Sequence, residues 1–276
     1  STDSTKIGIS RTNISAISAA AAAGVAIGGS NAVAVSGAGA FALNSILTKT
    51  RANLHNAIVT SSGAVTVNAV NSAVINSAVV SAALSVGGGG TTGVGASIGI
   101  AVAQNLIGYN ADGSAGSATT EASSTNTAIA AGGDLMLQSV SSQKIGTVVF
   151  AGSVAIAVGG TAGVGFAGSG VYVENRIDMN TSAFISGDGT TGISAANVSA
   201  LASDVSIISA FAGAASVSAA LGGTAGVSIS VGAAIARNDI GNQTQAYIVN
   251  ADQGVTATTG DITVRAIENA SIQVFT

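Results

Sequence analysis

Large apolar residues alternate with small residues along four stretches of the chain, and this pattern predicts β-strands. In the clearest stretch, residues 227–235, the odd positions are Val, Ile, Val, Ala and Ile, and the even positions are Ser, Ser, Gly and Ala. A period of two is typical of a strand, because successive side chains leave opposite faces of the pleat. The third stretch departs from the pattern, since Val171 and Val173 fall on its small face. Each strand is therefore expected to have one large apolar face and one face of Ala, Gly and Ser.

These strands belong to a block of about thirty residues that occurs four times. Each block opens at an isoleucine, has a glycine pair fourteen residues later, and has an asparagine eleven residues after the valine that follows the pair. The isoleucines are Ile14, Ile75, Ile145 and Ile208, which lie 61, 70 and 63 residues apart. The pairs are Gly28-Gly29, Gly89-Gly90, Gly159-Gly160 and Gly222-Gly223, and the asparagines are Asn44, Asn105, Asn175 and Asn238. Self-similarity at a fixed period indicates a repeat architecture.

The first half of each block is also predicted to be a strand, although runs of alanine such as residues 19–23 have high helix propensity. Val148, Phe150, Val154 and Ile156 share one face at even spacing, and no helix-capping residues flank the block. The glycine pair is expected to form the turn between the two halves, because glycine tolerates positive φ. The segments between blocks vary in length and carry most of the charges, so we expect them to project as loops along one edge.

The pattern predicts an all-β fold, a right-handed parallel β-solenoid (β-helix) that is flat and has closely packed small-residue faces. Residues 1–276 form one repetitive segment, with repeats at about 14–74, 75–144, 145–207 and 208–271 and partial repeats at both ends. Each repeat of about 64 residues is expected to supply one wide coil or a few narrow ones. The partial repeats at the two ends predict that the chain is a segment of a longer array or a processed chain.

The composition restricts the function classes. Only 7% of the residues are charged, against about 25% in an average globular protein. Pro, Cys and Trp are absent, and Gly accounts for 38 of the 276 residues. Such a chain suits thin, closely stacked sheets better than a thick core, and its regular apolar spacing argues against disorder. A net charge of −4 offers no basic stripe, so no nucleic-acid partner is expected.

The asparagines form the most specific motif. In a solenoid the equivalent positions of successive coils lie about 4.8 Å apart, so side-chain amides can hydrogen-bond along the stack as a ladder. An Asx turn that ends the strand is the alternative, and the two readings are compatible. Both give Asn44, Asn105, Asn175 and Asn238 a structural role.

No catalytic or cofactor site is predicted. His55 is the only histidine and has no nucleophile and acid beside it in sequence, so we expect no enzyme of the triad type. Asp112, Asp188 and Asp252 are candidates for loop calcium, but the spacing of an EF-hand loop is absent. We therefore expect them to be turn residues and expect no metal or other cofactor.

A membrane interpretation follows from residues 12–48, which contain no charge. A strand in a membrane is expected to place an apolar face against lipid and a polar face inward, with aromatic residues at the interfaces. Here the second face is Ala, Gly and Ser, and aromatic residues make up only 3%. Membrane insertion is therefore not favoured.

The repeat resembles the leukotoxin-like filamentous adhesins of bacterial surfaces. The similarity lies in Gly-Gly-Thr-Ala-Gly-Val (residues 159–164 and 222–227), the Ala/Ser/Val strand, Asn-x-Ile, and Gly-Asp-Ile-Thr-Val-Arg-Ala (residues 260–266). It covers nearly the whole chain. The resemblance implies secretion, a β-solenoid, and an adhesive, fibrous or toxin-associated role, with no catalytic residues.

Together, these observations predict a structural extracellular protein, part of a secreted filament, stalk or adhesin that assembles by stacking strands. Its expected partners are other copies of itself or further repeats of the same chain. Two alternatives remain: a module that binds host or cell-surface ligands through its variable loops, and a membrane-active, leukotoxin-like segment.

Overall fold

The computed structural model describes residues 4–276, so Ser1, Thr2 and Asp3 of the predicted first partial repeat lie outside it. Every regular element in this range is a β-strand. The strands of the first layer are β1 (Ser4–Gly28), β5 (Val65–Gly89), β9 (Leu135–Gly159), β13 (Val198–Gly222) and the shorter β17 (Ile262–Phe275). Those of the second layer are β2 (Asn31–Ile46), β6 (Thr92–Ile107), β10 (Ala162–Ile177) and β14 (Ala225–Ile240), continued by β3 (Lys49–His55), β7 (Thr119–Thr125), β11 (Asn180–Ser186) and β15 (Gln243–Val249). Short strands complete the set: β4 (Ile58–Ser61), β8 (Ala128–Ala131), β12 (Ile193–Ala195) and β16 (Val255–Ala257).

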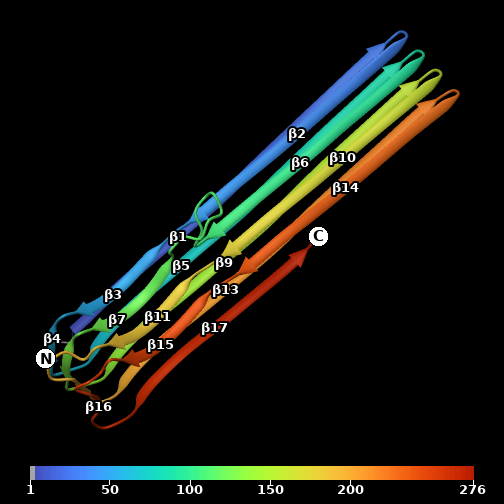
Figure 1. Cartoon of the computed structure of the whole chain (residues 1–276). Helices are drawn as coiled ribbons and strands as arrows, with labels where there is room; N and C mark the ends of the chain where they lie inside the picture. Colours follow the sequence, from blue (N-terminus) through green and yellow to red (C-terminus); the bar gives the residue numbers. More distant parts are fainter. Residues whose placement is uncertain (1–3) are drawn as a thin grey trace.

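These strands form four parallel sheets, and the chain is a flat β-solenoid as predicted (Figure 1). Sheet A has the order β1-β5-β9-β13-β17, and three sheets lie along its return path: sheet B (β14-β10-β6-β2), sheet C (β15-β11-β7-β3) and sheet D (β16-β12-β8-β4). Each repeat makes one wide coil, which runs out along sheet A, back along sheets B and C, and closes through sheet D. Ile14 pairs with Ile75, Ile75 with Ile145, and Ile145 with Ile208, so the register does not shift from coil to coil.

The coils have the predicted period, but they begin about ten residues before the isoleucines. Ile75 and Ile145 lie in the middle of 25-residue strands rather than at their starts. The segments between blocks are therefore not projecting loops, and that prediction was wrong. They form sheets C and D and the first part of the next long strand, because they alternate apolar and polar residues as regularly as the blocks do. Within residues 4–276, only residues 108–118 make a long excursion from the coil.

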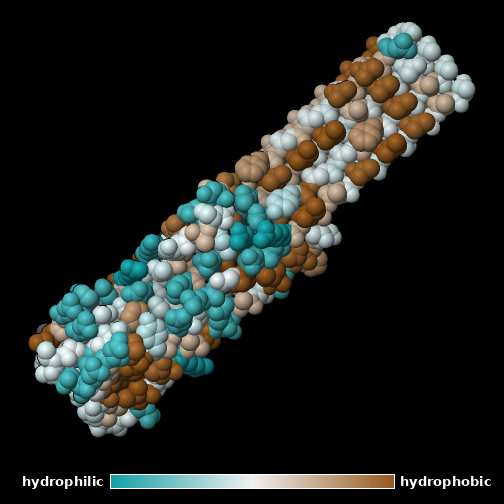
Figure 2. Space-filling view, viewed as in Figure 1, coloured by the Kyte–Doolittle hydropathy of each residue, from teal (hydrophilic) through white to brown (hydrophobic). Residues whose placement is uncertain are grey.

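The molecule has two halves that differ in charge. We call residues 15–43, 76–104, 146–173 and 209–236 the blade, since they form the long end that carries the turns between sheets A and B. The rest is the base. The blade contains no Asp, Glu, Lys or Arg. In Figure 2 hydrophilic residues gather over the base, and rows of hydrophobic residues cross the blade.

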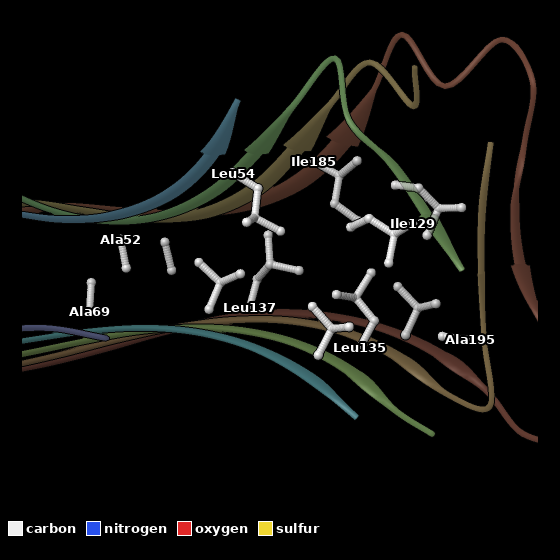
Figure 3. Close-up of a cluster of buried hydrophobic side chains, with 13 residues drawn as sticks. Ala52, Leu54, Ala69, Ile129, Leu135, Leu137, Ile185 and Ala195 are labelled. Carbon is white, nitrogen blue, oxygen red and sulfur yellow. The ribbon is translucent and has the colours of Figure 1, made fainter. Parts of the chain in front are cut away.

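Large aliphatic side chains fill the base. One cluster includes Leu54, Leu135, Leu137, Ile185 and Ile193, enclosed by sheets A, C and D (Figure 3). A second contains the buried isoleucines Ile75, Ile107, Ile145, Ile177 and Ile208. Burial of a side chain of this size contributes about 1.5–3 kcal/mol. The base therefore has an ordinary hydrophobic core, with most of its charges outside; Asp188 and Asp204 are among those that are buried.

The blade has the opposite arrangement. Its inward positions are mostly Ala, Gly and Ser, including the fully buried Ser81, Ser97 and Ala167. A Cβ added to Gly95 or Gly99 would lie 2.5 Å from a carbonyl oxygen of the facing sheet. The two sheets thus approach too closely for larger side chains at these points, which confirms the predicted small-residue interface. Most large residues of the blade point outward, and the buried Val79, Val149, Val171 and Val173 are the exceptions.

The paired glycines form the turns between sheets A and B, but they do so without positive φ. None of the eight has φ in the left-handed region. The reason for glycine is space: a Cβ at Gly90 would collide with the carbonyl oxygen of Gly29 in the coil below, and one at Gly89 would collide with that of Thr92 across the turn. Positive φ occurs instead at the base, in the corner residues Asn56, Asn126, Gly187 and Asn250.

Candidate assembly site

A continuous asparagine column runs through the stack. Asn44 Nδ2 donates to Asn105 Oδ1 at 2.8 Å, Asn105 Nδ2 to Asn175 Oδ1 at 2.8 Å, and Asn175 Nδ2 to Asn238 Oδ1 at 2.7 Å. Each asparagine precedes the end of its strand by two residues, so none of them forms an Asx turn at the strand end. The side chains therefore link all four complete coils in one hydrogen-bonded row.

The column lies at the junction of the two halves. Thr147, which is buried on sheet A, accepts a hydrogen bond from Asn105 Nδ2 at 2.9 Å and donates to Asn175 Oδ1 at 2.7 Å. The isoleucine cluster lies on one side of this row, and a cluster of Ala and Val that includes Val149 and Val173 lies on the other. Because buried amides must find partners, the row penalises any coil that stacks out of register.

A second buried polar group lies in the fourth coil, where the sequence pattern did not indicate one. Asp204 is fully buried on sheet A, and its Oδ1 accepts hydrogen bonds from Ser206 Oγ at 2.9 Å and Asn242 Nδ2 at 2.6 Å. Burial raises the pKa of this carboxyl above its ordinary value, and the nearby Glu268 carboxylate raises it further. The equivalent positions of the three preceding strands hold Ser10, Asn71 and Ser141, and the following strand β17 has Glu268, which is exposed. The acidic residue therefore recurs only in the last strand, which is too little to have indicated the site.

Both ends of the stack present open strand edges. Strand β17 covers β13 only from Val198 to Phe211, which leaves residues 212–222 and all of β14 and β15 without a further strand. At the other end β1, β2, β3 and β4 are the outermost strands. Pairing runs without interruption along β10 and β14, and the chain has no proline to block an edge. Such edges expose unpaired N–H and C=O groups, which can pair with another chain.

The excursion at residues 108–118 is fixed to the coils on both sides. The Arg176 guanidinium lies 3.9 Å from the centroid of the Tyr109 ring, and its Nη1 donates to the Gly113 carbonyl oxygen at 3.2 Å. From the preceding coil, Ser45 Oγ donates to the Tyr109 carbonyl oxygen at 2.7 Å. The residues that follow this excursion lie in a segment between blocks that was predicted to project as a loop, but they form strand β7.

The predicted loop acids Asp112, Asp188 and Asp252 do not form a metal-binding cluster. Asp252 is exposed and precedes Gln253, whose backbone N–H group donates to Asp188. Asp112 is exposed and accepts two hydrogen bonds from Ser114, which lower the pKa of its carboxyl. Asp188 is buried, and its Oδ2 accepts the backbone N–H groups of Gln253 at 2.7 Å and Gly254 at 2.6 Å, so it anchors the corner of the next coil. Within residues 4–276 no three His, Cys, Asp or Glu side chains come together in a way that could hold a metal ion. His55 ends β3 at the surface.

No protein family, curated protein or solved structure matches this chain. Among the described residues, no helix has the length and apolar character needed to cross a membrane.

Proposed function

We propose that this chain is a structural, self-assembling protein segment that extends by adding coils to its open edges. The observation that carries the proposal is the unshifted pairing of every coil with the next, a pattern that a further coil of another copy can continue. An added coil would find the same neighbours that each interior coil already has. We further propose that this fibre, stalk or adhesin lies outside the cell, which is what the resemblance to filamentous adhesins favours.

An edge variant tests the assembly. Ser230 lies on the inward row of β14, where its counterparts Ser36, Ser97 and Ala167 are buried, yet it is exposed because no strand covers it. A lysine at this position would become buried without a partner when another coil is added, which is how natural edge strands resist pairing. Ser230→Lys is therefore expected to stop growth without unfolding the chain.

The measurements are sedimentation velocity and negative-stain electron microscopy over a range of concentrations. Wild-type protein is expected to form particles that lengthen with concentration, and Ser230→Lys to remain at its starting length. The matched control is Gln243→Lys, which adds the same charge to the exposed outer side of the neighbouring strand β15. Wild-type protein that stays a compact monomer at high concentration would contradict the proposal.

The second candidate function is a surface-binding module, which the anchored excursion at residues 108–118 favours. Replacement of residues 108–118 by the two-residue connection Leu47-Thr48 of the first coil should then abolish binding to a cell surface while leaving the strand content intact. Labelled protein added to intact cells measures this. Equal binding of both proteins would remove this candidate.

A further inference from the structure

The outer faces of the blade are apolar even in the interior coils. On sheet A, Val148 is 51% exposed and Val154 is 37% exposed; on sheet B, Ile98 is 48% exposed. These residues lie in the second and third coils, which have a neighbour on each side. Their exposure is therefore a property of the faces and does not arise from the ends of the stack.

The apolar area is large on both faces. Four strands at the usual spacing, over the length of the blade, present about 45 Å by 19 Å, or on the order of 850 Å² per face. The largest apolar patch on a typical monomer is about 300–600 Å². A stable interface between two proteins buries about 800 Å² on each partner. Each face therefore offers the area that a stable dimer requires, with no charge inside it.

The outer face of sheet A in the blade is also grooved. Ala21, Ala82, Gly152 and Ala215 lie in register and form a shallow groove across four strands. Large residues border this groove on both sides, among them Phe150, Leu84, Val154 and Val217. Rows of large side chains beside a row of small ones allow two sheets to interlock when they pack face to face.

We propose that the outer faces of the blade are an interface between copies of this chain, in which the blade of one copy packs sheet-to-sheet against the blade of another. This contact is lateral and uses different residues from the open edges, so it does not depend on growth by added coils. Because each blade has two such faces, the contact joins chains or fibres into layers.

A second copy explains the faces better than a lipid bilayer does. In lipid, every backbone N–H and C=O group must be paired, and each unpaired group costs several kcal/mol. The edge strands β2 and β14 would expose such groups along the blade. Between two blades these edges remain at the rim, where water can hydrate them.

Single-cysteine variants test the contact, since the chain has no native cysteine. Val154→Cys lies on the proposed interface, and the control Ser142→Cys lies on the same strand and the same outer face but in the base, where it is exposed. With a short bis-maleimide cross-linker, Val154→Cys or the second variant Ile98→Cys is expected to give dimers, and Ser142→Cys is not. Equal cross-linking at residue 142 would overturn the proposal.

Affinity gives an independent measurement. In the Ser230→Lys background, which prevents growth at the edge, Val154→Lys is expected to raise the lateral dissociation constant at least about tenfold, because the interface would bury an unpaired ammonium group. Ser142→Lys should leave the constant unchanged. Val154 is exposed in the single chain, so the melting temperature should not fall.

Two results would contradict the proposed lateral contact between blades. One is a Ser230→Lys protein that stays monomeric at every concentration. The other is flotation with phosphatidylcholine vesicles in preference to self-association, which would assign the faces to lipid. A protein that carries both Ser230→Lys and Val154→Cys should no longer grow into fibres but should still cross-link. This result would show that the edge contact and the lateral contact are independent.

Discussion

At the scale of single residues, the asparagine column requires each coil to place an amide side chain where it can hydrogen-bond the amide of the next coil. Asn105 is fully buried and takes part in hydrogen bonds with Asn44, Asn175 and Thr147. Asn238, at the end of the column, accepts one hydrogen bond from Asn175 and is only partly buried. An asparagine inside the column is therefore expected to contribute more to the stability of the fold than the asparagine at its end.

We expect Asn105→Ala to lower the free energy of unfolding by about 2–4 kcal/mol, since each buried polar group left without a partner costs about 1–3 kcal/mol. Asn238→Ala is the matched control and should cost less than half as much. Chemical denaturation of both variants measures the difference. Equal losses would show that the column does not act as a connected row.

Asp204 makes stability depend on pH in the direction opposite to most carboxylates. Its pKa is raised by burial, so the folded state favours the protonated form over the unfolded state, whose pKa is near 3.8. Its ionisation therefore destabilises the fold above the raised pKa, and this cost disappears as the pH falls toward 3.8. Asp204→Asn should melt at a higher temperature than wild type at pH 7, and the two should converge near pH 4.

Asp112→Asn is the control of opposite sign. The pKa of Asp112 is lowered by its hydrogen bonds to Ser114, so its contribution to stability is present at neutral pH and is lost as the pH falls. Thermal melts from about pH 2 to pH 8 compare the two variants, because the lowered pKa of Asp112 places the loss of its contribution below pH 3.8. If the melting temperatures of wild type and Asp204→Asn differed by the same amount at every pH in this range, the raised pKa of Asp204 would be contradicted.

At the scale of elements, the close approach of the sheets in the blade depends on particular glycines. A Cβ at Gly93 would collide with the backbone carbonyl of Val158, which cannot move without displacing a strand. Gly170, on the outward face of β10, has open space around it. We expect Gly93→Ala to destabilise the fold by at least about 2 kcal/mol, as overpacking of a tight interior does.

Gly170→Ala should be neutral or slightly stabilising, because alanine restricts the unfolded chain. Urea denaturation followed by circular dichroism compares the two variants. If both were tolerated equally, the sheets would be able to separate without cost, and the small-residue interface would not determine the thickness of the blade.

The strands and the repeat could be predicted from the sequence, because a period of two and a fixed spacing are local signals. The continuity of β5 through Ile75 was missed, although Val65, Val67, Ala69 and Ala73 continue the same alternation. The corner residues Asn56 and Asn250, each twelve residues after its column asparagine, were also missed. Asp204 could not be predicted, since its burial comes from pairing with residues one coil away.

At the scale of the whole molecule, the unshifted register means that one coil can substitute for another. Deletion of residues 145–207 joins Lys144 to Ile208, two positions that are adjacent in the pairing of β9 with β13. We expect this shortened chain to fold, to keep its strand content and to melt cooperatively, with Asn105 now beside Asn238.

Deletion of residues 145–206 is the control, because it retains one additional residue, Ile207, inside the strand. A shift of one residue turns every following side chain to the opposite face of the sheet, so large residues would enter the thin interior of the blade. Circular dichroism and thermal melting of both shortened chains test this. A folded control would show that the register is not fixed by the faces.

The constant separation of paired strands has a consequence for the rate of folding. Nearly every strand pair joins residues 61 to 70 positions apart, as the hydrogen bonds of the asparagine column show. A chain with few local contacts must close long loops before any pairing stabilises it, which slows folding. The first two coils bear this entropic cost without a template, whereas each later coil joins a surface that already exists. Refolding should therefore show a lag that pre-formed fragments of the stack abolish.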